Sequence, residues 1–206
     1  MTMIKTVFYF LFFISLPALA QPEQELSEKL KAIKTFSAEF TQQLTDPSGD
    51  EIQTTQGNVM VKSPGLFHWQ VNPPYEQLVV ANQQFLWVYD ADLEQVTVSD
   101  RKTLDNSPAQ ILSGDFSSLG EQYEVTVETA DAVTRYTMKA LDKAVSTFTQ
   151  LEFTFDKKNT LQSMILVDKL SQITAVTFKK QNINSEISNS LFDFIAPEGV
   201  DIIANH

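Results

Sequence analysis

The sequence predicts a mainly β protein whose strands form a curved antiparallel sheet or a barrel, with a few short helices on one side. Apolar and polar residues alternate in many short runs, and turn-forming residues separate those runs at hairpin spacing. Helical periodicity is confined to two short stretches. About ten strands with one or two helical insertions are typical of a sheet that curves on itself.

The first twenty residues have the pattern of an export signal. Lys5 precedes an apolar run over residues 6–17, and Ala18-Leu19-Ala20 supplies the small residues of a cleavage site. A membrane anchor is the alternative, but the run is shorter than the roughly 20 apolar residues that cross a bilayer. We expect residues 1–20 to be a cleaved signal peptide and residues 21–206 to form one domain.

The charge balance is acidic, and cysteine is absent. The chain carries 15 basic and 26 acidic residues, a formal charge of −11, and removing Lys5 with the signal makes it −12. A protein this acidic is repelled by nucleic acid and by anionic membrane surfaces. Without cysteine the core must hold without disulfides, and no acylated cysteine can anchor the protein.

The two helical stretches are short. Leu26, Leu30 and Ile33 fall at i, i+4 and i+7, which predicts a helix that is marginal alone and must lie on the sheet. Residues 107–112 place a serine N-cap before proline at the first helical position. The closing segment, residues 191–203, is expected to be irregular. Strands are expected over residues 36–44, 52–62, 66–71, 76–81, 85–89, 95–99, 123–128, 134–140, 148–155, 161–167 and 173–180.

Catalytic and metal-binding patterns are weak. The only histidines are His68, within an expected strand, and His206 at the end of the chain, and there is no Gly-x-Ser-x-Gly or glycine-rich phosphate loop. Residues 90–94 (DADLE) begin like a calcium loop but lack its central glycine and distal glutamate. The sequence therefore predicts no enzyme, no metal site and no cofactor.

Large aromatic residues gather on three neighbouring strands. Phe67 and Trp69 share one face of a strand, and Phe85 and Trp87 share one face of another. Leu78 and Val80 lie on the strand between them, which predicts one contiguous apolar surface. Composition alone leaves open whether this surface is core or the lining of a cavity.

Several segments, in this order, resemble the outer-membrane lipoprotein carrier (LolA) family. The matching stretches are residues 36–42 (FSAEFTQ), 56–69 (QGNVMVKSPGLFHW), 85–98 (FLWVYDADLEQVTV), Asn106-Ser107-Pro108 leading to Ile111-Leu112, and residues 192–200 (FDFIAPEGV). Each stretch is weak alone, and together they span nearly the whole chain after the signal.

The resemblance implies an incomplete, half-open antiparallel β-barrel with short α-helices as a lid over its mouth. It implies a monomeric periplasmic chaperone that shields the acyl chains of triacylated lipoproteins in an apolar cavity. The partners would be the lipoprotein cargo, an inner-membrane ABC exporter that loads it and an outer-membrane receptor that accepts it.

The resemblance also assigns residues. Phe67 matches a phenylalanine near the cavity mouth, Trp69 a tryptophan facing the interior, and Leu30, Ile111 and Leu112 the apolar faces of the lid. If Phe67 lies at the mouth, glutamate there should leave folding intact. The expected acyl-chain set is Leu30, Phe67, Trp69, Leu78, Val80, Phe85, Trp87, Ile111 and Leu112.

One position departs from the family. An arginine that latches the lid usually precedes the motif proline, whereas this chain has Ser63 before Pro64. A hydroxyl offers one donor and a short reach, against five donors on a long stem. The latch is therefore absent or moved to another residue such as Lys62.

Two other functions remain possible within this resemblance. The receptor for the same cargo is itself a lipoprotein, which the lack of cysteine disfavours. A paralogue serving another lipid export route, or a lipid-sensing barrel, is the remaining alternative, and Ser63 is the residue that favours it.

Overall fold

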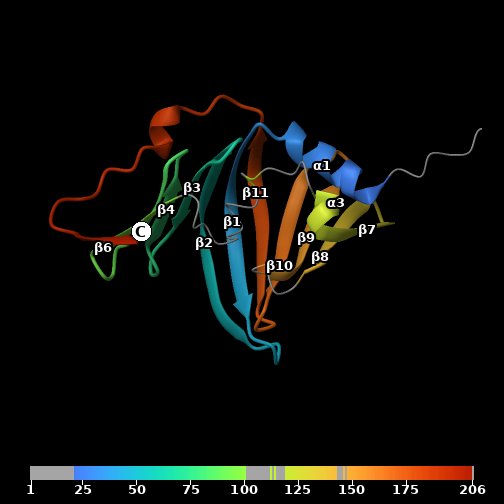
Figure 1. The fold of residues 1–206 in the computed structure, drawn as a ribbon, viewed down its shortest axis with the longest axis horizontal. Helices are drawn as coiled ribbons and strands as arrows, with labels where there is room; N and C mark the ends of the chain where they lie inside the picture. Colours follow the sequence, from blue (N-terminus) through green and yellow to red (C-terminus); the bar gives the residue numbers. More distant parts are fainter. Residues whose placement is uncertain are drawn as a thin grey trace, which may run out of the picture.

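Twelve strands form one open sheet in the computed structural model, which describes residues 21–100, 112, 114, 119–142, 146 and 148–205 (Figure 1). The sheet order is β12-β6-β5-β4-β3-β2-β1-β11-β10-β9-β8-β7, so β12 and β7 are its edges. The expected mainly β fold with an unclosed sheet is confirmed. The expected signal peptide and Ile111 lie outside the described residues. The strands are β1 Thr35–Thr45, β2 Glu51–Lys62, β3 Leu66–Val71, β4 Gln77–Ala81, β5 Phe85–Asp90, β6 Gln95–Asp100, β7 Tyr123–Ala130, β8 Val133–Ala140, β9 Phe148–Asp156, β10 Leu161–Asp168, β11 Ile173–Ile183 and β12 Asp201–Asn205.

Two runs of antiparallel hairpins meet at a central seam between β1 and β11. β1 to β6 pair in chain order, and β7 to β11 do the same. At the seam Phe40 lies opposite Phe178 and Leu44 opposite Thr174, which joins residues far apart in the sequence. The seam brings the start of β1 beside the end of β11, where α1 ends and the C-terminal segment begins.

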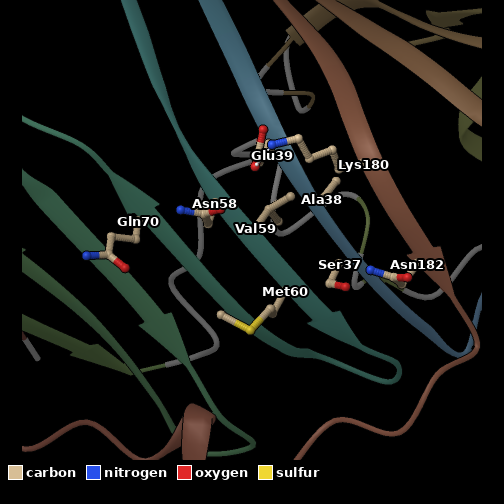
Figure 2. A pocket seen from close by; sticks show the side chains of 9 residues that line it. All are labelled: Ser37, Ala38, Glu39, Asn58, Val59, Met60, Gln70, Lys180 and Asn182. Carbon is tan, nitrogen blue, oxygen red and sulfur yellow. Dashed lines mark hydrogen bonds and ion pairs between the residues drawn. The ribbon is translucent and has the colours of Figure 1, made fainter.

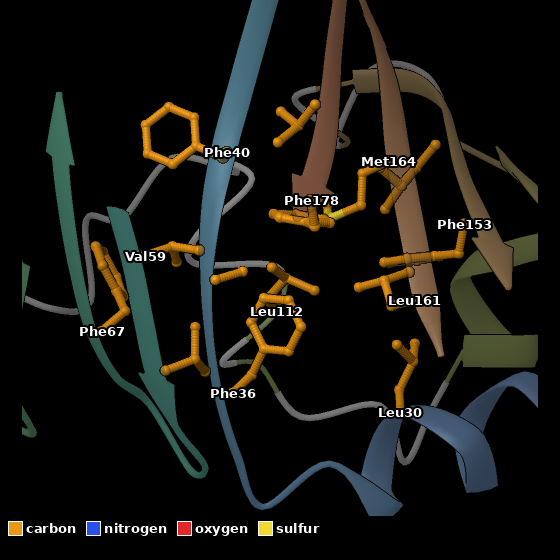
Figure 3. Packing of buried hydrophobic residues seen from close by; sticks show 14 of the residues in the cluster. Leu30, Phe36, Phe40, Val59, Phe67, Leu112, Phe153, Leu161, Met164 and Phe178 are labelled. Atoms are coloured by element: carbon orange, nitrogen blue, oxygen red, sulfur yellow. The ribbon is translucent and has the colours of Figure 1, made fainter. Parts of the chain in front are cut away.

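Strand alternation gives the sheet an inner face and an outer face. The inner face is the one that carries Phe36, Phe40, Val59 and Phe67, all buried in a single hydrophobic cluster. Figure 3 shows these side chains converging with those of β9 to β11 and with Leu30 of α1. The inner face is therefore the main core, and α1 covers part of it.

Two short helices are described, and both lie beside the β7 end of the sheet (Figure 1). α1 spans Pro22–Ala32, with proline in its first turn, acidic residues near its start and basic residues near its end, as the helix dipole favours. Leu26 and Leu30 are buried, which confirms the predicted stripe. α3, Leu119–Gln122, contacts α1 and β7.

The C-terminal segment crosses from the seam to the far edge of the sheet. It passes through the 3-10 helix η2, Asn189–Phe192, and ends in β12, which pairs in parallel with β6 (Figure 1). The prediction of an irregular ending was wrong for residues 201–203. Parallel pairing to a distant strand leaves no local turn signal, so the sequence pattern does not reveal it.

Candidate functional site

The inner face brings together four of the predicted site residues. Phe67 is 0% exposed, and Leu30, Trp69 and Leu112 are also buried in the same cluster. Trp69 stacks on Phe40 with ring centroids 3.9 Å apart. These residues form a continuous apolar lining that runs from α1 to the middle of the sheet.

The sequence reasoning missed most of the inner lining. Phe36 and Phe178 meet edge to face, 5.2 Å apart, and Phe153 and Met164 lie on the same face from the other half of the sheet. The alternation of apolar and polar residues in β1 and in β9 to β11 could have identified these residues. The prediction drew its strand residues from β3, β4 and β5 alone and took its other residues from the two helical stretches.

The prediction of one contiguous apolar surface was wrong. Phe67 and Trp69 lie opposite Ala81 and Val79 of β4, whereas Val80 lies opposite His68 and Trp87. Leu78, Val80 and Trp87 therefore face the outer side of the sheet. Because alternation fixes only which residues of one strand share a face, the register between strands had to be known to join them.

The outer apolar residues pack under the C-terminal segment. Phe194 lies over Trp87, with ring centroids 6.0 Å apart, and beside Tyr89. Phe192 is buried, and Phe85 contacts Trp87 but stays 39% exposed. Of the predicted acyl-chain set, Leu78, Val80, Phe85 and Trp87 thus belong to a second apolar layer on the other side of the sheet from α1.

His68 lies on this outer side, opposite Met60 and Val80. Its Nδ1 is buried without a hydrogen-bond partner among the described residues. Burial lowers the pKa of the imidazole from its ordinary value of 6.5, because desolvation penalises the charged form. His68 is therefore a packing residue of the outer side of the sheet.

Polar contacts hold α1 on the β8–β10 side. The hydroxyl of Tyr136 donates a hydrogen bond to the carboxylate of Glu25, and Lys29 donates to Asn159 Oδ1 at 2.6 Å. Burial, and then the bond and charge of Glu25, raise the pKa of Tyr136. The helix is thus attached to one half of the sheet by a few side-chain hydrogen bonds at its rim.

Asn184, just after β11, fastens the end of α1 to the seam. Its Oδ1 accepts from the backbone N–H of Lys34 at 2.7 Å and of Thr35 at 3.3 Å, and its Nδ2 donates to the carbonyl of Ala32 at 2.9 Å. Asn184 has a φ of 58°, a conformation that asparagine tolerates better than most residues. One side chain therefore satisfies three backbone groups where the helix gives way to β1.

We expect Asn184→Gly to loosen α1, because it keeps the positive φ and removes the three hydrogen bonds. The free energy of unfolding should fall by about 1–2 kcal/mol, and amide exchange over residues 26–32 should accelerate. Asn184→Asp retains the acceptor and should give a smaller change. Unchanged protection of α1 in Asn184→Gly would show that the helix is held without this side chain.

The position that departs from the family does not hold α1. The backbone N–H of Ser63 donates to the carbonyl of Lys34 at 2.8 Å. Lys62 extends instead to the C-terminal segment, where its Nζ donates to the carbonyl of Ile187 at 3.2 Å and to Asn189 Oδ1 at 2.6 Å. In this structure Lys62 fastens the C-terminal segment to the end of β2.

Polar hollows occur away from the apolar lining. Figure 2 shows one of about 380 Å³ on the outer side of the central strands, where Lys180 pairs with Glu39 at 2.8 Å. It forms where the register shifts between Ser37 and Glu39, and amide side chains such as Asn58 and Gln70 line it. Among the described residues no three His, Cys, Asp or Glu are placed to hold a metal ion.

The geometry defines an open β half-barrel whose apolar inner face lies under a short helix. The model of the family described as "outer membrane lipoprotein carrier protein LolA" matches residues 31–195. A protein of Azotobacter vinelandii named outer-membrane lipoprotein carrier protein is 39% identical over 181 residues, covering 87% of this chain and 86% of that one. One of the same name from Hahella chejuensis is 38% identical and covers 92% and 91%.

The chain belongs to the outer-membrane lipoprotein carrier (LolA) family. A crystal structure of an uncharacterized conserved protein from Thermus thermophilus has the same fold, with a TM-score of 0.55 at 11% identity, covering 90% of this chain and 99% of that one. Within the described ranges, no helix is long and apolar enough to cross a membrane.

Proposed function

We propose that this protein is a periplasmic carrier that shields the acyl chains of lipoproteins on their way to the outer membrane. The observation that carries the proposal is the apolar inner face under α1, from Leu30 to Trp69, in a chain of this family. Phe67, Trp69, Leu30, Leu112 and the neighbouring Ile111 are the residues we assign to cargo.

The size of the hydrophobic effect explains why a carrier is needed. Burying a methylene contributes about 0.8 kcal/mol, so three chains of about sixteen carbons would cost on the order of 30–40 kcal/mol to expose to water. An inner face made of Phe, Leu, Val and Met side chains removes most of that cost. Unbranched Met138 and Met164, both buried, can change rotamer around chains of different length.

Loading requires α1 to move. The inner residues are packed against one another and against Leu26 and Leu30, so acyl chains must replace these contacts. Polar attachments of α1 to the described part of the sheet include Glu25 with Tyr136, Lys29 with Asn159, and the Asn184 amide. Such hydrogen bonds contribute about 0.5–3 kcal/mol each, the larger values applying to charged groups, which is small beside the burial of three acyl chains, so cargo can displace the helix and the helix can return.

The partners and the setting complete the proposal. An inner-membrane ABC exporter would load the carrier, and an outer-membrane lipoprotein receptor would unload it. The export signal at residues 1–20 would place residues 21–206, as one domain and a monomer, in the periplasm. The strong negative charge disfavours both adsorption to anionic membranes and binding to nucleic acid. The protein would act by binding and release rather than by catalysis.

A soluble complex with an acylated peptide tests the proposal. The mature protein is mixed with a fluorescent triacylated lipopeptide and separated by size, with the same peptide lacking acyl chains as the control. We expect a one-to-one complex that forms only with the acylated peptide, and ATP-dependent loading from vesicles that carry the exporter. Failure of the acylated peptide to leave its micelles would overturn the shuttle function. Capture of other lipids alone would favour the paralogue of another export route.

A further inference from the structure

The inner face changes character beyond the Phe40–Trp69 stack. Two residues further along β1, Gln42 pairs with Thr55, and two residues beyond Trp69, Val71 pairs with Gln77. Apolar residues thus give way to amides and hydroxyls at the end of the sheet remote from α1. The apolar lining and this polar end share one face but differ in the ligands they suit.

A cavity of about 230 Å³ occupies the polar end. By volume it has room for on the order of seven water molecules. Three carboxylates line it, from Glu76, Asp90 and Asp92, and none of the described residues in its lining is basic. Its other lining residues are Gln42, Gln53, Thr55, Val71, Tyr75 and Gln77.

Thr55 supplies an independent sign that the cavity binds a hydrogen-bond donor. Its side chain is 9% exposed, and its Oγ1 is buried without a hydrogen-bond partner among the described residues. Buried hydroxyls are normally satisfied, because leaving one unpaired is costly. Thr55 shares the cavity side of the sheet with its partner Gln42, so a ligand N–H that displaced the atoms covering this oxygen would find an acceptor.

The carboxylates remain available to such a ligand. One oxygen of Asp90 accepts from the backbone N–H of Leu93 at 3.1 Å, and within the described residues no lysine or arginine pairs with any of the three. The spacing does not suit a metal ion, since no three acidic or histidine side chains of the described residues are placed to share one. A larger cation that donates several hydrogen bonds fits better.

We propose that this cavity binds a primary alkylammonium group. The three N–H donors would reach a carboxylate and the Thr55 hydroxyl, while Val71 and the half-exposed ring of Tyr75 would contact the methylene stem. The group could belong to a lysine side chain of a bound polypeptide or to a free diamine, which present the same chemistry. The site is separate from the acyl-chain lining and does not depend on the carrier function.

The test uses the full mature chain, with 1,5-diaminopentane and N-acetyl-lysine methylamide as probes and 1-pentanol as the uncharged control. Calorimetry and amide chemical shifts should show saturable binding of an ammonium probe, with shifts at residues 55, 71, 77 and 90, and none with pentanol. The tighter of the two probes identifies the source of the ammonium.

Variants test whether the ammonium probe binds in this cavity. Asp90→Asn and Thr55→Val should each weaken binding at least tenfold, whereas Glu94→Gln, with the same charge change in the same turn but outside the cavity, should not. Thr55→Val should at the same time raise the melting temperature, because it removes an unpaired buried hydroxyl. Equal weakening by Glu94→Gln, binding of calcium alone, or no saturable binding of either probe would overturn the proposal.

Discussion

Glutamate in place of Phe67 is expected to lower the free energy of unfolding by about 4 kcal/mol or more. Phe67 is 0% exposed and lies between Val61 and Ala81 on the neighbouring strands. The substitution leaves an unfilled volume and buries a carboxylate without a partner, and each effect alone costs several kcal/mol. Urea denaturation followed by circular dichroism measures the change.

Phe85→Glu is the matched control for this experiment. It makes the same substitution on the outer side of β5, where Phe85 is 39% exposed, and should lower stability by no more than about 2 kcal/mol, the contribution of a partly buried phenylalanine. The expectation that glutamate at position 67 leaves folding intact assumed that Phe67 lies at the open mouth of the cavity. If Phe67→Glu folds with wild-type stability, that placement is right and the packing described here is not maintained in solution.

Gly57→Ala is expected to destabilise the protein by about 3 kcal/mol or more, the upper range for overpacking a core. A Cβ at this position would lie 1.8 Å from the backbone oxygen of Gln70 and 2.8 Å from the ring of Phe40. The backbone oxygen cannot turn aside as a side chain would, so β2 and β3 would have to separate. Thermal unfolding and expression yield measure the effect.

Gly120→Ala provides the comparison. The added methyl group would meet only the flexible Glu23 side chain, at 3.1 Å, and alanine is favoured over glycine within α3 by about 1 kcal/mol. Its stability should equal or exceed that of the wild type. Similar losses in both variants would mean that glycine is needed for backbone freedom and not for the close approach of β3.

Local patterns predicted the strands well. The β3 bounds agree with the expected residues 66–71, and the other expected strands differ from the observed ones by a few residues at their ends. Alternation and turn residues are local, so they are visible in one sequence. A glycine within a strand often marks a bulge, yet Gly57 pairs regularly with Phe40 and Val71, and only the close approach of the Gln70 backbone explains why glycine is needed there.

The candidate site was harder to predict because it depends on the register between strands. Phe67 and Trp69 were placed on the lining and lie on the inner face, whereas Val80 and Trp87 lie on the outer face. No local signal in β4 tells which of its two apolar faces meets α1. The C-terminal segment determines which face is the outer one, since Phe194, more than a hundred residues later in the sequence, covers Trp87.

The seam between β1 and β11 also dictates an order of folding. β1 to β6 can pair from neighbouring hairpins as soon as these residues are free to fold, but the partner of β1 on its other side lies more than a hundred residues later. Until β11 arrives, Phe36 and Phe40 lack their neighbours from the second half of the sheet. Such long-range pairing is slow and leaves apolar surface open to aggregation. We therefore expect the chain itself to need a chaperone until β11 has paired with β1.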